Sequence, residues 1–291
     1  MKKIAVLNDL SGFGKCSLTA AIPVLSALGV QCCPLPSAVL TGQTGYSHYK
    51  CTDLTFMIPD YIDCWKKNHA HFDGIYSGYM TGMPQIELFM QFIDVFREKD
   101  TFLLVDPVMG DDGRTYGIFN EGLLSGMKQL CQKADLITPN LTEACLLADY
   151  DVKKLLENGT KDLLLKTAEE IAQTLRKKAL ISQDVVITGI KARKDPSPFI
   201  YNLTVTDDGT FVDRSHFFDR SFSGTGDLFA SVLCGCRANG FSTQKSVALA
   251  SSFIYHSIAD TINDDIPPNE GVLFERHLID LINGRLTYEK N

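Results

Sequence analysis

The sequence is 291 residues long and 45% hydrophobic, so it can bury a large core and is not disordered. Its net charge of −7 and the lack of a long basic run exclude a surface built for nucleic acid. The first apolar run turns polar at Asn8, which is too early for a signal peptide, and no run is long enough to span a bilayer. We therefore expect a cytoplasmic protein without a membrane partner.

Short apolar runs alternate with helical patterns over the first two thirds of the chain. The runs predict six strands, at about residues 3–7, 30–35, 72–77, 101–105, 135–138 and 185–188. The segments between them predict helices at about residues 18–28, 53–67, 84–97, 121–132, 141–147 and 162–178. This alternation is typical of an α/β fold with an open, mostly parallel central sheet and helices on both faces.

The pattern changes after residue 188. Apolar runs at 199–205 and 210–212 flank Asp207-Asp208-Gly209, which predicts a hairpin. The remaining chain predicts helices at about residues 226–239, 243–261 and 271–283. Because no linker or repeat interrupts the chain, we expect residues 1–291 to form a single domain with a small hairpin near 199–212.

The motif Gly224-Thr225-Gly226-Asp227, called the glycine corner below, lies just before a predicted helix. Its glycines allow the N–H groups of Thr225, Gly226 and Asp227 to converge, and a helix N-terminus attracts anions such as phosphate. Asp227 could accept a proton from a hydroxyl that attacks this phosphate. The alternative is an aspartate that only caps a helix after a glycine turn.

Acidic residues also follow two of the predicted strands. Asp106 ends one strand, Asp111 lies in the following loop, and Glu143 lies one helical turn after Asn140. The carboxyl ends of parallel strands line a ligand crevice, so these groups could hold a Mg²⁺ that bridges nucleotide phosphates. For any one of these acids alone, loop solvation or helix capping is the favoured explanation. Together with the glycine corner they favour phosphoryl transfer.

Six segments spread over nearly the whole chain carry a family resemblance. They are residues 42–46 (GQTGY), 77–79 (SGY), 106–111 (DPVMGD), 137–144 (ITPNLTEA), 185–189 (VVITG) and 224–227 (GTGD). The sequence resembles the ribokinase superfamily and, within it, the pyridoxal kinases. The resemblance implies a ribokinase-like fold and ATP-dependent phosphorylation of the 5′-hydroxyl of pyridoxal, pyridoxine or pyridoxamine, which is a step of vitamin B6 salvage.

The resemblance also implies roles for single residues. Asp227 would be the catalytic base, and Gly224, Thr225 and Gly226 would supply the anion hole. Asp111 and Glu143 would lie near Mg²⁺, directly or through water. The residues expected near the ATP phosphates and a monovalent cation, K⁺, are Asp106, Thr138, Asn140 and Thr188. The residues expected around the pyridine ring are Ser11, Gln43, Thr44 and Tyr79. The expected partners are the small-molecule substrate, ATP and a second copy of the chain in a homodimer.

Two departures from the family pattern lie in the expected substrate pocket. Gln43 stands where many relatives carry His, and residues 9–12 differ from the usual Ser-His opening, so the preferred vitamer stays open. One alternative is a hydroxymethylpyrimidine kinase, although such enzymes usually show Gly-Gly-Ala-Gly where this chain has Gly12-Phe13-Gly14-Lys15. The other is a non-catalytic B6-binding protein, against which the intact Asp227 argues.

Overall fold

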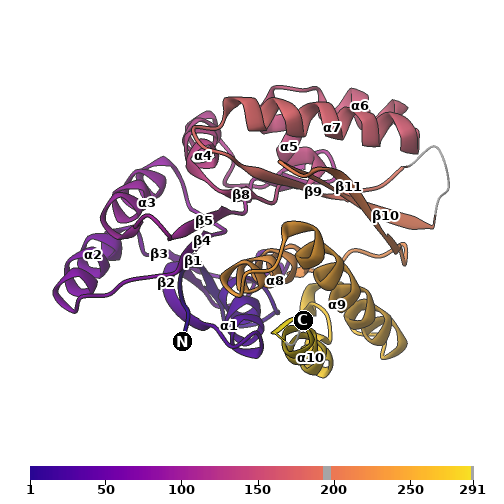
Figure 1. The fold of residues 1–291 in the computed structure, drawn as a ribbon. Coiled ribbons are helices and arrows are strands. Elements are labelled where there is room, and N and C mark those ends of the chain that lie inside the picture. The colour runs from indigo at the N-terminus through magenta and orange to yellow at the C-terminus, as the bar shows by residue number, and fades with distance from the viewer. Residues whose placement is uncertain (193–197, 290–291) are drawn as a thin grey trace.

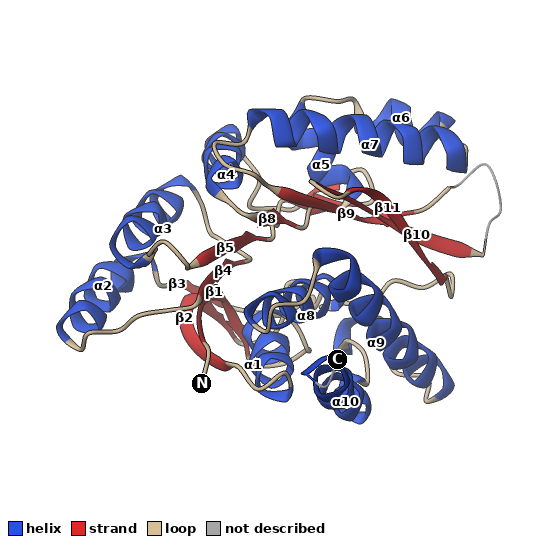
Figure 2. Ribbon diagram, viewed as in Figure 1, coloured by secondary structure: helices blue, strands red, loops and turns tan. Residues whose placement is uncertain are grey.

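The computed structural model describes residues 1–192 and 198–289, and a nine-stranded sheet forms its centre (Figures 1 and 2). The strand order is β11-β10-β9-β8-β5-β4-β1-β2-β3. These strands are β1 (Lys3–Ser11), β2 (Gln31–Leu40), β3 (Cys51–Asp53), β4 (Gly74–Ser77), β5 (Phe102–Val105), β8 (Leu136–Ile137), β9 (Asp184–Ile190), β10 (Phe199–Thr206) and β11 (Gly209–His216). From β2 to β9 all neighbours pair in parallel, which confirms the predicted open, mostly parallel sheet.

The antiparallel pair of β10 and β11 extends the sheet at one edge, and β3 extends it at the other. A separate short pair is formed by β6 (Gly110–Asp111) and β7 (Arg114–Thr115). The hairpin is thus continuous with the central sheet. The expectation of a single domain stays a prediction.

Helices cover both faces of the sheet (Figure 2). One face carries α2 (Ile58–Lys67), α3 (Met83–Phe96), α4 (Glu121–Lys133), α5 (Leu141–Ala148) and α7 (Lys161–Lys178), with the short α6 (Val152–Asn158) beside them. The other face carries α1 (Ser17–Ala27), α8 (Thr225–Ala238), α9 (Thr243–Asn263) and α10 (Leu278–Glu289). No helix in the described ranges has both the length and the apolar composition needed to cross a bilayer.

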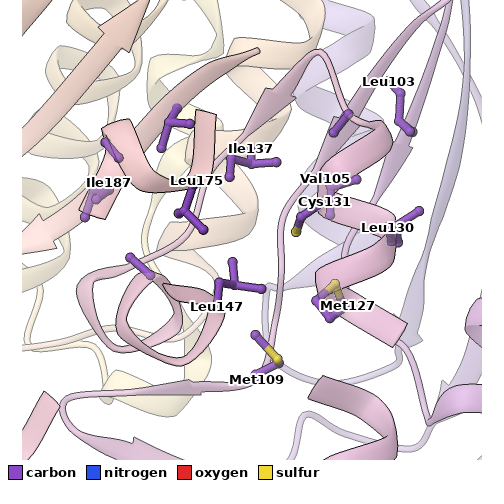
Figure 3. Close-up of a cluster of buried hydrophobic side chains, with 14 of the residues drawn as sticks. Leu103, Val105, Met109, Met127, Leu130, Cys131, Ile137, Leu147, Leu175 and Ile187 are labelled. Atoms are coloured by element: carbon purple, nitrogen blue, oxygen red, sulfur yellow. The ribbon is translucent and has the colours of Figure 1, made fainter. Parts of the chain in front are cut away.

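The two faces bury different kinds of side chain. Where α2 meets α3, Trp65 of α2 packs against the rings of Phe72 and of Phe92 and Phe96 in α3. Aliphatic and methionine side chains fill the same layer under α4, α5 and α7 (Figure 3). On the other face α1 lies close to α8. Gly235 of α8 has no Cβ, so the side chain of Leu28, at the end of α1, can pack directly against the α8 backbone. This close approach fixes α8, whose first turn carries the glycine corner, against the sheet.

Two predicted boundaries near the site were wrong. The polar residues after Leu7 suggested that the first strand ends there, but Leu10 and Ser11 still pair with Val39 and Leu40 of β2. The helix predicted from residue 53 begins only at Ile58, because residues 51–53 form β3 instead. In both places strand pairing with a distant segment overrides the local pattern.

The last predicted helix, at residues 271–283, was also wrong at its start. Gly271 has φ +83°, and two short 3₁₀ turns, η2 (Pro268–Glu270) and η3 (Phe274–His277), occupy this region before α10 begins. A left-handed residue cannot continue a right-handed helix, so the chain forms a loop here. This loop lies beside the glycine corner, since the N–H of Ser223 donates to the carbonyl of Pro268 at 3.1 Å.

Candidate active site

The glycine corner begins α8 without a side-chain cap. Gly224 has φ +78°, and a Cβ at this position would lie 1.9 Å from the carbonyl oxygen of Lys15, so only glycine fits. The first N–H groups of a helix have no partner within the helix. Those of Thr225, Gly226 and Asp227 therefore give this corner the positive potential that the sequence predicted for an anion site.

The Asp227 carboxylate lies in the first turn of α8 and is held from the sheet. Asn8 of β1 donates from Nδ2 to Oδ1 of Asp227 at 3.1 Å. The other end of the Asn8 amide accepts the N–H groups of Tyr79 and Asp9, at 2.9 and 3.0 Å, so its orientation is fixed. Burial raises the pKa of Asp227 to about 6, and a hydrogen bond from the Ser17 N–H partly opposes this. Asp227 is thus a stronger base than an exposed aspartate but still ionised at pH 7.

Asp106 lies where β5 ends, and it is 8% exposed. The Thr138 hydroxyl donates to its Oδ1 at 3.1 Å. Burial raises the pKa of Asp106, and the charges of Glu143 and Asp227 raise it further. Like charges affect each other in this way only at short range, so these three acids lie close together.

Glu143 is buried and closes the first turn of α5. Its Oε2 accepts the N–H of Asn140 at 2.9 Å, and the Asn140 side chain accepts the N–H of Glu143 at 3.0 Å, which forms a capping box. Its Oε1 accepts the N–H of Met109 at 3.0 Å. Burial outweighs these bonds and raises the pKa of Glu143 to about 8. Both carboxyl oxygens already hold backbone groups, which suits contact with a metal through water.

Asp111 and Thr188 both lie near the start of α5, and the charge of Asp111 is among the causes that raise the pKa of Glu143. Burial raises the pKa of the Asp111 carboxyl, while the nearby Lys191 lowers it. Thr188, near the end of β9, bridges to Asn140, and its N–H donates to the carbonyl of Pro139 at 2.9 Å. The residues predicted to lie near the nucleotide and metal are therefore neighbours. Their individual roles stay predictions.

The residues predicted for the substrate pocket differ in exposure. Ser11 is buried and donates to Oδ2 of Asp9 at 2.8 Å, whereas Thr44 is exposed. Burial raises the pKa of the Tyr79 phenol, with Asp9 among the charges that add to the shift. Gln43 uses both ends of its amide within the protein: Oε1 accepts the N–H of Gly45 at 2.7 Å, and Nε2 donates to the carbonyl of Asn269 at 3.1 Å.

Sequence reasoning placed Asn8 and Asp9, at a strand end, in one site with Asp227 but gave neither a specific role, and it missed Asn269. Asn8 orients Asp227, and the Asp9 carboxylate accepts the hydroxyls of both Ser11 and Ser17. The Asn269 side chain donates to the carbonyl of Gly45 at 2.9 Å, so the loops of Asn269 and Gly45 are joined by a second hydrogen bond. The only sequence signal for Asn8 and Asp9 was their place after an apolar strand. Asn269 follows a Pro-Pro pair that indicated only a break between helices.

A parallel sheet covered on both faces, with an open helix start and several acids at one strand edge, defines a kinase of the ribokinase-like class. The sequence model described as phosphomethylpyrimidine kinase matches residues 17–270. The chain belongs to this family.

Three known proteins place the chain more closely. A crystal structure from Bacteroides thetaiotaomicron VPI-5482, provisionally described as a phosphomethylpyrimidine kinase and solved with pyridoxal, is 36% identical with a TM-score of 0.89 and covers 96% of this chain and 95% of its own. The pyridoxal kinase structure from Lactobacillus plantarum is 27% identical with a TM-score of 0.86 and covers 97% of both chains. The pyridoxal kinase of Dictyostelium discoideum is 26% identical over 267 residues, which is 86% of this chain and 84% of that protein.

Proposed function

We propose that this kinase transfers the γ-phosphoryl group of ATP to the 5′-hydroxyl of pyridoxal, pyridoxine or pyridoxamine, as in vitamin B6 salvage. The observation that carries the proposal is the Asp227 carboxylate, held by Asn8 beside the open start of α8. Relatives named pyridoxal kinase and a structure solved with pyridoxal support the substrate class.

In the proposed reaction Asp227 accepts the proton of the 5′-hydroxyl as the oxygen attacks the γ-phosphorus and ADP leaves. A base with a pKa of about 6 is ionised at pH 7 and still basic enough for this transfer. The N–H groups of Thr225 and Gly226 face the negative charge on the phosphoryl oxygens and stabilise it. Asn8 keeps the carboxylate aimed at the hydroxyl.

The donor set fits Mg²⁺, because hard carboxylate oxygens are the ligands that this cation prefers. Asp111 and Glu143 would hold it, and Glu143 would act through water because its oxygens bond backbone N–H groups. The bound cation would supply charge neutralisation on the phosphates. The hydroxyl and carboxylate oxygens proposed to lie near K⁺ and the ATP phosphates belong to Asp106, Thr138 and Thr188, with Asn140 beside them.

The substrate would lie between the glycine corner and the ends of β1 and β4. Ser11 and Tyr79 come from these two strand ends, and Thr44 is exposed in the loop after β2. An aromatic face with a few hydroxyls suits a flat heteroaromatic ring. Gln43 would shape the pocket mainly by holding the loops of Gly45 and Asn269 together.

The description of the family favours a second candidate, a kinase of hydroxymethylpyrimidine, whose substrate is also a flat ring with a hydroxymethyl group. A coupled ADP-release assay over the three B6 vitamers, hydroxymethylpyrimidine and ribose separates the two. We expect the highest kcat/KM with a B6 vitamer and no turnover in excess EDTA. A higher kcat/KM for hydroxymethylpyrimidine would replace the first candidate by the second, and turnover in EDTA would remove the metal.

A homodimer in the cytoplasm stays our expectation for the assembly and the location. Light scattering of the purified protein tests the first, and cell fractionation tests the second. A monomer at the concentration used for the kinase assay would contradict the dimer.

A further inference from the structure

Two histidines and an aspartate come together where α9 meets the start of α10. His256 lies on α9, His277 ends η3, and Asp280 lies in the first turn of α10. One ligand atom from each lies within 4.8 Å of the others. The two imidazole rings stack with centroids 5.7 Å apart. None of these residues belongs to the proposed kinase site.

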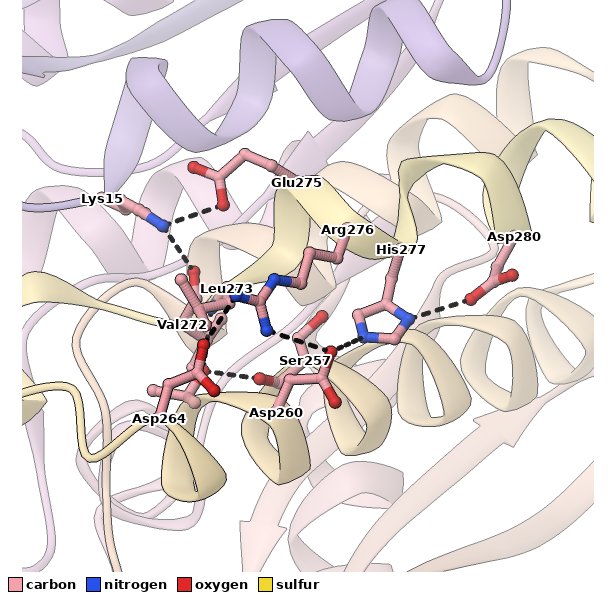
Figure 4. A network of polar contacts seen from close by, with 11 residues as sticks. Lys15, Ser257, Asp260, Asp264, Val272, Leu273, Glu275, Arg276, His277 and Asp280 are labelled. Atoms are coloured by element: carbon pink, nitrogen blue, oxygen red, sulfur yellow. Dashed lines mark hydrogen bonds and ion pairs between the residues drawn. The ribbon is translucent and has the colours of Figure 1, made fainter.

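A second carboxylate orients the central histidine (Figure 4). The Nδ1 atom of His277 lies 3.2 Å from Oδ2 of Asp280, and its Nε2 atom lies 3.2 Å from Oδ2 of Asp260. A neutral imidazole has one N–H donor and one acceptor, so it cannot donate to both carboxylates. If Nε2–H donates to Asp260, the Nδ1 atom carries a lone pair that faces the Asp280 carboxylate. A cation between Nδ1 and this carboxylate would stabilise the arrangement.

We propose that His256, His277 and Asp280 bind one divalent transition-metal ion of the Zn²⁺ class, with Asp260 orienting His277 from behind. Histidines that bind metals usually donate their other N–H to a carboxylate, which is the place of Asp260. Imidazole donors select Zn²⁺, Ni²⁺ or Cu²⁺ over Mg²⁺ and Ca²⁺, and the absence of a thiolate from the set disfavours Cu⁺. Three protein ligands leave the fourth tetrahedral position to water.

The ligands can reach the bound geometry with small movements. Zinc lies about 2.0 to 2.2 Å from nitrogen and oxygen ligands, so donor atoms around it are roughly 3.5 Å apart, closer than the widest separation here. His256 is exposed and the Asp280 side chain is 46% exposed, so both can change rotamer freely. The less exposed His277 is already held by Asp260. Arg276 offsets the charge behind the site, with a nitrogen 3.7 Å from Asp260 and another 2.6 Å from Asp264.

A metal at this site would link α10 to α9, close to the segment that packs against the glycine corner. Glu275 precedes the site by two residues and pairs with Lys15 at 2.8 Å, and the Lys15 ammonium lies 5.6 Å from the centre of the Phe274 ring. The carbonyl oxygen of Lys15 is the atom that leaves no room for a Cβ on Gly224. A metal at His277 would therefore stabilise the segment against which the corner packs.

The test is Zn²⁺ titration of the full chain without a histidine tag, by calorimetry in buffer with millimolar Mg²⁺ to occupy sites made of oxygen donors. We expect one Zn²⁺ per chain, and binding at least tenfold weaker in His256→Gln and in Asp280→Asn. Asp264→Asn is the matched control, since it changes a neighbouring acid outside the ligand set and should bind like the wild type. Circular dichroism in EDTA shows whether each variant is folded.

Thermal unfolding and a spectroscopic probe provide independent readouts. Saturation at 100 times the wild-type dissociation constant should raise the Tm of the wild type by about 5 °C and that of His256→Gln by about half as much or less. Co²⁺ in place of Zn²⁺ should give visible absorption bands that disappear in the same variants. Absence of saturable Zn²⁺ binding, or binding of equal strength in folded His256→Gln and Asp280→Asn, overturns the proposal.

Discussion

The helices α5 and α8 both begin with an acid in the third helical position, and the two acids end up in different surroundings. Glu143 in α5 bonds back to its own N-cap, Asn140, and closes the helix start. In α8 the N-cap is Gly224, which has no side chain, and Asp227 bonds to Asn8 of a distant strand instead. An N-cap side chain therefore decides whether the first N–H groups of a helix are occupied or stay available to an anion.

The difference also changes how each acid can serve the reaction. Each Glu143 oxygen already accepts a backbone N–H group, so this acid mainly holds the start of α5 and the Met109 loop together. The Asp227 carboxylate has one side-chain partner and lies next to open amides, which is the arrangement that a proton acceptor needs. Substitutions on the two helices test whether the two acids differ in this way.

The largest expected effect is that of Asp227→Asn on turnover. Asn keeps the shape but cannot accept the proton, so kcat should fall by 10² to 10⁴, or roughly 3 to 5 kcal/mol in the barrier.

The same substitution should change stability. Because the carboxyl pKa rises from 3.8 to about 6 on folding, ionised Asp227 destabilises the protein above pH 6, and this cost disappears below about pH 4. The variant should therefore be more stable at pH 7, by about 1 to 3 kcal/mol. ADP-release kinetics and urea unfolding measure both, and a kcat within threefold of wild type contradicts the base assignment.

Gly224→Ala should destabilise the fold by about 3 kcal/mol, since it combines left-handed strain with a clash against Lys15. Gly240→Ala is the matched control, because Gly240 has φ +82° but no atom within 4 Å of the added Cβ. The difference between their unfolding free energies isolates the clash. Equal losses would mean that the corner is free to move away from Lys15.

On the closed helix, Glu143→Ala should cost about 2 kcal/mol of stability, because buried N–H groups lose their acceptor. Glu143→Gln keeps an acceptor in the third position and should cost less than half as much. Urea unfolding of both variants decides this. If Gln is as damaging as Ala, the second carboxyl oxygen, which Gln lacks, matters more to α5 than the capping box.

The smallest expected effect is on the pH dependence of the wild-type enzyme. Protonation of Asp227 removes the base, so kcat/KM should fall about tenfold per unit below pH 6, which is about 1.4 kcal/mol per unit. Rates measured between pH 5 and 8 test this. A flat profile would show that Asp227 does not titrate in the free enzyme, and then the contrast with Glu143 would not be one of basicity.

The sequence predicted the parallel sheet and the glycine corner because both depend on short stretches of chain. Apolar runs between turns marked six strands, and the glycines around Thr225 marked an open helix start. It could not predict that β1 continues to Ser11, since the polar residues there are stabilised by partners such as Ser17 and by pairing with β2. The sequence shows that the two acids follow different N-cap residues, Asn140 and Gly224, but it could not show that Asn8 orients Asp227, because that bond comes from a distant strand.

This contact between Asn8 and Asp227 joins residues 219 positions apart in the chain. During synthesis at about 5 to 20 residues per second, Asn8 precedes its partner by roughly 10 to 45 s. The first strands can pair in that interval, but the emerging chain has no catalytic base until α8 docks. Activity would then appear only after α8 has been synthesised, and ribosome-bound chains that stop before Asp227 should be inert whatever structure they have already formed.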